Sequence, residues 1–212
     1  GAAPGDVFFF HFSGHGAQQE DKLGLESDGM NETILPVDFQ RSGQITDDEI
    51  VRLIVAPLPD GCKLTAVMDS CHSGTGLDLP FKWNQRFQRW DEDVNPLFCR
   101  ADVQLFSGCE DGHCSADART RYGLPMGAMT TAFVETLQQN PSPNYSELMS
   151  HMHQILRQRG FGQKPQLSSS QAFHFNRPFL LSDIVSNGNP QVGRMRRKFF
   201  PPRRLTTNAF QF

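Results

Sequence analysis

Two reactive side chains, Cys71 and His15, each follow a short apolar segment of the sequence. Cys71 comes shortly after residues 64–68, and His15 comes shortly after residues 7–12. Uninterrupted apolar runs of this length are typical of strands that are buried on both faces of a sheet. In open parallel sheets, catalytic and ligand-binding groups collect in the loops at the carboxyl ends of the strands. If the two strands are parallel neighbours, the thiol and the imidazole face each other across one crevice.

A thiol and an imidazole in one crevice can carry out nucleophilic catalysis. A cysteine forms a thiolate near neutral pH beside a base or a cation, and a histidine can act as either. Taken alone, Cys71 would be interpreted as a small buried hydrophobic residue and His15 as a polar residue with satisfied hydrogen bonds. Two such strand-end loops in one chain favour the catalytic interpretation instead.

Helical patterns occur in three parts of the chain. The sequence Thr46–Glu49 is a capping box, which predicts a helix that continues over residues 50–55. Apolar residues at helical spacing predict a second helix over residues 126–138 and a third over residues 146–159, with Ser146 as the cap of the third.

Strand patterns alternate with these helices. Residues 103–107 resemble the two apolar runs before His15 and Cys71 and predict a third buried strand. Residues 171–175 alternate between polar and apolar types and predict a final strand, whereas the aromatic and charged residues 81–93 are interpreted as a loop. Alternating strands and helices indicate an α/β sandwich with a mostly parallel sheet.

Composition indicates one domain and a basic tail. The 212 residues are 38% hydrophobic, which is enough for one domain with a full core. Residues 186–212 hold six basic side chains and no acidic one. Because the whole chain has a formal net charge of −3, residues 1–185 carry −9. We expect a folded core over residues 1–185 and a flexible tail over residues 186–212. An acidic core is not expected to bind nucleic acid.

The cysteine pattern and the lengths of the apolar runs indicate the compartment. The five cysteines are an odd number at irregular spacing, and the sequence does not start with a secretory segment. Free thiols in a reducing compartment, the cytoplasm, are therefore expected. No apolar run approaches the roughly 20 residues that a membrane span needs, so no membrane partner is expected.

Several sequence motifs resemble one peptidase family. Residues 13–16 and 69–74 are similar to the His and Cys motifs of the metacaspases, the caspase-like cysteine peptidases of clan CD, and within them to the type I members. Further similarities extend in order over about residues 6–180, at residues 35–38, 56–59, 77–80 and 106–109. The resemblance implies a caspase-like α/β/α sandwich with a mostly parallel sheet. It also implies that the strand before His15 is not the first of the family core, so an N-terminal βα unit is expected to be missing.

The resemblance implies a role for each residue of the two motifs. Cys71 would be the nucleophile and His15 its proton acceptor and donor. The backbone N–H groups of Gly16 and Cys71 would form the oxyanion hole. Asp69 lies two residues before the nucleophile and Ser13 two residues before the histidine, so both would face the substrate. Asp69 would bind an Arg or Lys side chain at P1, the substrate residue before the cleaved bond; the alternative is a turn-initiating aspartate.

Acidic residues resemble the calcium ligands of type I metacaspases. The matching positions are Asp47, Asp48 and Asp78, and a fourth position corresponds to Asn31 or to Asp28. Ca²⁺ takes 6–8 oxygen ligands, which suits such a group. Alternatively, Asp47 and Asp48 only stabilise the positive end of the helix dipole in the first turn of their helix.

The sequence and the resemblance together predict a calcium-dependent cysteine endopeptidase with a Cys-His dyad that cleaves proteins or peptides after Arg or Lys. Cleavage after Asp is not expected, because no arginine lies next to either motif. The resemblance implies a monomer. Two alternatives stay open. The chain could be a catalytically incompetent, regulatory or scaffolding fragment, or a binding module whose basic tail contacts acidic partners or nucleic acid.

Overall fold

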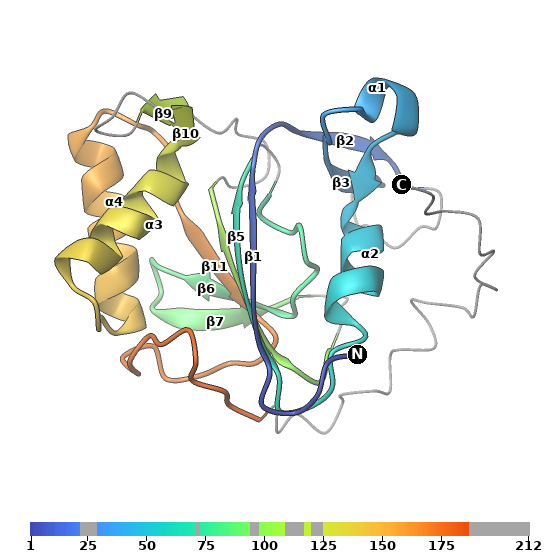
Figure 1. The fold of residues 1–212 in the computed structure, drawn as a ribbon. Helices are drawn as coiled ribbons and strands as arrows, with labels where there is room; N and C mark the ends of the chain where they lie inside the picture. The colour runs from blue at the N-terminus through green and yellow to red at the C-terminus, as the bar shows by residue number, and fades with distance from the viewer. Residues whose placement is uncertain (22–28, 71–72, 94–97, 109–116, 120–124, 187–212) are drawn as a thin grey trace.

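A six-stranded sheet runs through the middle of the molecule, with helices on both of its faces (Figure 1). The computed structural model describes residues 1–21, 29–70, 73–93, 98–108, 117–119 and 125–186. Cys71, Asp28 and almost all of the predicted tail lie outside these described residues.

The central sheet contains strands from the whole length of the core. In spatial order it consists of β1 (Val7–Ser13), β5 (Lys63–Asp69), β8 (Asp102–Ser107), β11 (Gln166–Ser169), β6 (Phe81–Asn84) and β7 (Arg89–Glu92). The pairs β1–β5 and β5–β8 are parallel, and the remaining three pairs are antiparallel. Four of the six strands, β1, β5, β8 and β6, therefore point the same way. The predicted α/β architecture with a mostly parallel sheet is confirmed.

Two smaller sheets and the helices complete the fold. One small sheet consists of β2 (Gly16–Glu20), β3 (Met30–Ile34) and β4 (Ile45–Thr46), and the other of β9 (Asp117–Arg119) and β10 (Pro125–Gly127). The helical elements are α1 (Phe39–Ser42), α2 (Asp47–Ile50), the π-helical turn η1 (Val51–Val55), α3 (Ala128–Gln139) and α4 (Tyr145–Gln158). In Figure 1, α3 and α4 cover the left face of the central sheet and α2 covers the right.

The core has two halves, one on each face of the sheet. Along β5, Leu64 and Met68 pack with α2 and η1, whereas Val67 packs with α3 and α4. On β8, Phe106 points to the same side as Val67. Successive side chains of a strand alternate between faces, so these strands need apolar residues at consecutive positions to bury both sides. Every residue of β5 and β8 is buried, as the apolar runs predict. The same prediction for residues 7–12 is wrong: β1 is an edge strand, and Val7, Phe8 and Phe9 are exposed.

The helix starts agree with the sequence in one case and differ in another. The predicted capping box of Thr46 and Glu49 is present: Glu49 N–H donates to Thr46 Oγ1 at 3.1 Å, and Thr46 N–H donates to Glu49 Oε2 at 3.3 Å. The prediction of Ser146 as the cap of α4 is wrong. Asn144 caps this helix and its side chain accepts the N–H of Glu147 at 2.8 Å.

The strand predicted over residues 171–175 is also wrong. The last strand of the sheet is β11, which ends at Ser169. The alternation has another cause: Phe173 and Phe175 pack against Trp90 and Trp83 of the β6–β7 hairpin, with 3.7 Å between the ring centroids of Trp83 and Phe175. Residues 81–92, interpreted from sequence as a loop, form that hairpin. None of the helices in the described ranges combines the length and apolar character that a membrane-spanning segment requires.

Candidate active site

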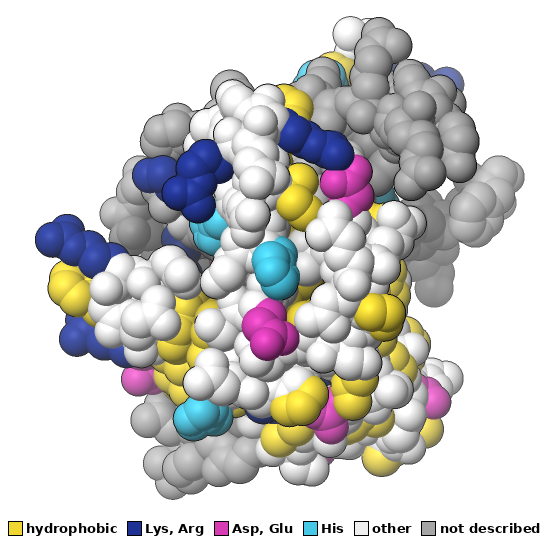
Figure 2. Space-filling model, turned by 90° about the vertical axis from the view of Figure 1, so that its left-hand side faces the viewer, with side chains coloured by type: hydrophobic (Ala, Val, Ile, Leu, Met, Phe, Trp, Pro, Cys, Tyr) yellow, Lys and Arg dark blue, Asp and Glu magenta, His cyan; other side chains and the backbone are white. Residues whose placement is uncertain are grey.

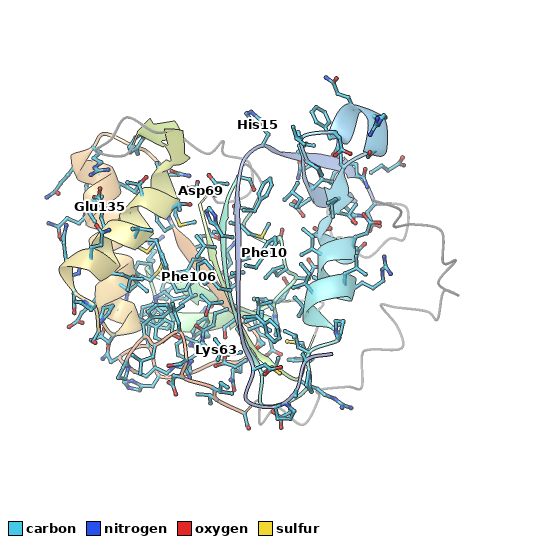
Figure 3. All side chains as sticks on the ribbon, in the orientation of Figure 1. Phe10, His15, Lys63, Asp69, Phe106 and Glu135 are labelled. Atoms are coloured by element: carbon cyan, nitrogen blue, oxygen red, sulfur yellow. The ribbon has the colours of Figure 1, made fainter. Side chains whose placement is uncertain are left out.

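The loops that carry the two sequence motifs follow neighbouring parallel strands. Ser13, the last residue of β1, is the register partner of Asp69, the last residue of β5. His15 lies two residues beyond β1, and Cys71 follows β5 at the same distance, outside the described residues. Figure 3 shows His15 and Asp69 at one edge of the central sheet and Lys63, at the start of β5, at the opposite edge. The two strands are parallel neighbours, which is the condition for the two motifs to face one crevice.

The backbone of the His15 loop is attached on both sides. The N–H of Gly14 donates to the carbonyl oxygen of Asp69 at 3.3 Å, and the carbonyl oxygen of His15 accepts the N–H of Leu35 at 3.0 Å. A Cβ on Gly14 would lie 2.9 Å from the ring of Phe12, so a larger residue here would require the ring to move. The His15 side chain itself is exposed. The loop therefore holds an accessible imidazole on a fixed backbone.

Asp69, the last residue of β5, is buried beside the His15 loop, with an exposed fraction of 2%. Its Oδ2 accepts the N–H of Thr130, in the first turn of α3, at 2.7 Å. Its Oδ1 accepts a hydrogen bond from Nε2 of Gln163 at 3.1 Å. A Cβ on Gly108 would lie 2.7 Å from Oδ1, and one on Gly127 would clash with the carboxylate. The carboxylate therefore also acts as an anchor for the N-terminus of α3.

The other predicted substrate and oxyanion residues lie beside these groups. Ser13 is exposed and stands opposite Asp69 in the strand register. Gly16 begins β2 and pairs with Ile34 of β3. The pairing of β2 with β3 continues the His15 loop into the small sheet, so the backbone of Gly16 is held near the edge where β1 ends.

The predicted calcium ligands fall in two places. Asp47 is 1% exposed and accepts the backbone N–H groups of Glu32, at 3.0 Å, and Asp48, at 2.8 Å. Oδ2 of Asp48 accepts Nδ2 of Asn31 at 3.4 Å, while Oδ1 of Asn31 is buried and has no hydrogen-bond partner among the described residues. Asp78 has a positive φ of 45° in a separate turn. Within the described ranges, no three His, Cys, Asp or Glu residues lie close enough to share one ion.

Asp21 is a neighbour of this cluster that the sequence alone does not indicate. Burial raises the pKa of the Asp48 carboxyl, and the charge of Asp21 raises it further. Asp21 follows β2 directly, and its N–H donates to the carbonyl oxygen of Gly29 at 2.8 Å, just before β3 begins. The β2–β3 hairpin therefore places Asp21 near Asp48, although the two are 27 positions apart in the sequence.

Comparisons with known proteins agree with the motif resemblance. A sequence profile of the family described as "Metacaspase, peptidase C14 domain" matches residues 1–80. The protein named Metacaspase-1 of Plasmodium falciparum is 40% identical, over 92% of this chain and 32% of that protein. Metacaspase-1 of Mycosarcoma maydis is 39% identical, over 80% of this chain and 53% of that protein. Metacaspase-1 of Schizosaccharomyces pombe is 37% identical, over 85% of this chain and 53% of that protein.

The chain thus spans between about a third and about half of the length of these relatives. One crystal structure, of a protein from Geobacter sulfurreducens, has a similar fold. Its TM-score is 0.53 at 24% sequence identity, and the match covers 78% of this chain and 66% of that one. This likeness concerns the fold alone.

Proposed function

This chain belongs to the metacaspase family, and we propose that it is a cysteine endopeptidase in which Cys71 and His15 form the catalytic dyad. The observation that carries the proposal is the parallel pairing of β1 with β5, which ends with Ser13 opposite Asp69. This pairing brings the two motif loops to one edge of the sheet. The exposed imidazole of His15 supports the same assignment, since a general base must be able to reach its proton.

The proposed reaction is acyl transfer to the thiol. His15 takes the proton of Cys71, and the thiolate attacks the carbonyl carbon of the scissile peptide bond. The backbone N–H groups of Gly16 and Cys71 stabilise the negative oxygen of the tetrahedral intermediate. His15 then gives its proton to the leaving amine, and the acyl group stays on Cys71 as a thioester. Water, deprotonated by His15, hydrolyses the thioester and regenerates the thiol.

Covalent labelling tests this assignment without depending on turnover. A peptidyl chloromethyl ketone with Arg at P1 should alkylate Cys71 in the native chain, as located by peptide mass spectrometry. The label should be lost in His15→Ala, because a thiol without its base is a weak nucleophile. Equal labelling of every cysteine, or labelling that His15→Ala leaves unchanged, would remove the dyad from the proposal.

Specificity for Arg or Lys at P1 is proposed for Asp69. Its carboxylate is buried beside the motif loops, where an ion pair with a substrate cation is screened little by water. Both of its oxygens already accept hydrogen bonds, from Thr130 and from Gln163. A substrate guanidinium must therefore replace the bond from the Gln163 side chain, which can turn away more easily than the backbone of α3.

Comparing substrates separates this role from the structural one. Asp69→Asn should lower kcat/KM by about 30-fold or more for peptides with Arg at P1, since an unpaired buried cation loses about 2 kcal/mol or more. Peptides with a neutral P1 residue should lose far less. Equal losses for both would mean that Asp69 only anchors α3.

Calcium dependence is proposed for the cluster around Asp48. The buried Oδ1 of Asn31, which has no hydrogen-bond partner among the described residues, is an oxygen that a cation could bind, and Asp48 lies beside it. Bound Ca²⁺ would offset the repulsion between Asp48 and Asp21. Asp47 and Asp78 complete the proposed set. The four side chains are not yet arranged around one point, because Asp47 accepts two backbone N–H groups and Asp78 lies in a separate turn.

This cluster lies close to Ser70, which directly follows β5. Asp47 and Ser70, the residue before Cys71, line the same small cavity of about 10 Å³. Isothermal calorimetry with CaCl₂ tests the site directly: binding at about 10⁻⁴ to 10⁻³ M is expected, and it should be lost in Asp48→Asn. The same affinity in wild type and variant would leave these aspartates as groups that stabilise α2.

A further inference from the structure

A second cavity, of about 820 Å³, lies between the β6–β7 hairpin, the end of α4 and the segment that leads into β11. Four cationic side chains from these elements line it: Lys82, Arg86, Arg157 and Lys164. None of the four forms an ion pair with a described residue. Figure 2, which faces the α3–α4 side, shows Lys and Arg side chains gathered toward the upper and left parts of the view, with few acidic ones.

The charge of this cavity is opposite to that of the core around it. Asp91 is the acidic residue among its described lining residues, and it is already engaged. Asn84 donates a hydrogen bond to it and the Arg89 guanidinium lies 2.9 Å away, which together hold the pKa of Asp91 below its usual range. The cavity therefore presents four cations that form no ion pair with a described residue, on a core that carries −9. Such a site attracts anionic groups.

The size of the cavity and the origin of its cations favour an extended ligand. The cavity of about 820 Å³ is much larger than a phosphate ion, and its four cations come from three separate elements. A peptide with several Asp or Glu side chains can therefore contact more of these cations than a single phosphate group can. The cavity fits an acidic peptide better than a phosphate compound.

The cavity is joined to the proposed P1 site through one residue. Gln163 lines the cavity and donates from Nε2 to Oδ1 of Asp69 at 3.1 Å. Gln166 is the register partner of Ser107, at the end of β8, so the cavity opens at the same edge of the sheet as the motif loops. A peptide bound at Asp69 can therefore extend into it.

We propose that this cavity is a substrate subsite that binds Asp or Glu side chains flanking the basic P1 residue. The inference rests on the proposed peptidase function and adds a preference for acidic sequence context. Lys82, Arg86, Arg157 and Lys164 are the specificity-determining residues of this subsite. The substrate carboxylates that pair with these side chains would be exposed or half-buried. Salt would therefore screen the ion pairs, and the preference should weaken as the salt concentration rises.

Two peptides and two charge variants test the proposal. Both peptides carry one Arg, flanked by three Glu residues on each side in one peptide and by three Gln residues on each side in the other. The test variant is Arg86→Gln/Arg157→Gln/Lys164→Gln, in which all three side chains are exposed. The control variant is Arg41→Gln/Arg52→Gln/Arg100→Gln, which removes the same charge from exposed positions outside the cavity.

The wild-type chain and the control variant should have kcat/KM values about tenfold higher for the Glu peptide than for the Gln peptide, the scale of several partly exposed ion pairs. The test variant should lose this ratio and keep its rate on the Gln peptide. A ratio near one in wild type, or a ratio that the test variant retains, would overturn the proposal.

A binding measurement separates failure of the subsite from failure of the peptidase function. Fluorescence anisotropy of the labelled Glu peptide with the Cys71→Ala chain needs no turnover. If neither peptide is cleaved but the Glu peptide binds, and binding falls about tenfold when the three cavity cations are removed, the subsite stands and the peptidase function fails. Binding that is unaffected by those substitutions would overturn the subsite. Tighter binding of inorganic tripolyphosphate than of the Glu peptide would also overturn it, in favour of a small-anion site.

Discussion

Removal of the Asp69 carboxylate should destabilise the whole domain, whether or not a substrate is bound. Asp69→Ala leaves the N–H of Thr130 buried without an acceptor, which costs about 1–3 kcal/mol. The lost bond from Gln163 contributes about 1 kcal/mol, and the lost charge at the start of α3 about 0.3–1 kcal/mol. We therefore expect the free energy of unfolding to fall by roughly 2–5 kcal/mol.

Urea unfolding followed by far-UV circular dichroism measures this loss. The matched control is Asp60→Ala, at an exposed carboxylate that accepts only the N–H of the next residue and should change the free energy of unfolding by less than about 1 kcal/mol. A loss below about 1 kcal/mol in Asp69→Ala would refute the conclusion that this carboxylate anchors α3.

Four further outcomes follow from buried groups. Lys63→Met should lower the free energy of unfolding by about 3 kcal/mol in a thermal or urea melt, because it leaves the buried Asp102 without the ammonium 3.5 Å away. Burial lowers the pKa of Lys63 in the folded chain below the 10.5 expected for the unfolded chain. At a pH between these two pKa values the unfolded chain binds more protons than the folded chain, so the stability of wild type relative to Lys63→Met should increase as the pH rises through this range. Burial raises the pKa of Cys99 to about 12, so iodoacetamide at pH 8 should label Cys99 only after denaturation, as read by mass spectrometry. Gly127→Ala should lower the melting temperature because the new Cβ clashes with a buried carboxylate, whereas Gly162→Ala, which meets no atom within 4 Å, should not.

The parts of the fold that were predictable from sequence are those with a strong local signal. Mainly apolar runs predict the strands β5 and β8 correctly, because such runs occur where a sheet is covered on both faces. The equally apolar run before His15 forms β1, a partly exposed edge strand, and its position at the edge depends on strand order rather than on its own sequence. The capping box at Thr46 is a local hydrogen-bond pattern that needs no tertiary context. Parallel neighbours need a long crossover connection, and the segment between the two motif strands, which contains the predicted helix, is long enough to provide one.

The β6–β7 hairpin was missed because its signals are tertiary. Trp83 and Trp90 are direct register partners, and their ring centroids lie 5.4 Å apart, but aromatic pairs of this kind are visible only once the strands are aligned. The turn contains no glycine, and Gln88 has the positive φ of 51° that a hairpin turn usually assigns to Gly or Asn. Phe175 then stacks on Trp83, which explains the false strand over residues 171–175.

The candidate site was predictable in its motifs and less so in its surroundings. The positions of His15 and Asp69 follow from strand ends, which the sequence indicates directly. The contacts of Asp69 with Thr130 and Gln163 join residues 61 and 94 positions apart, and no local pattern indicates them. The approach of Asp21 to Asp48 likewise depends on the register of the β2–β3 hairpin.

The catalytic dyad is tested most directly by the turnover of one peptide with a single Arg at P1. The wild-type chain should cleave this peptide on the carboxyl side of the Arg. Cys71→Ala and His15→Ala should each lower kcat by about 10⁴-fold or more, and the double variant should be no slower than the worse single variant, because the two residues act as one unit. Near wild-type turnover in either single variant, in a preparation free of other peptidases, would contradict the assignment of Cys71 and His15.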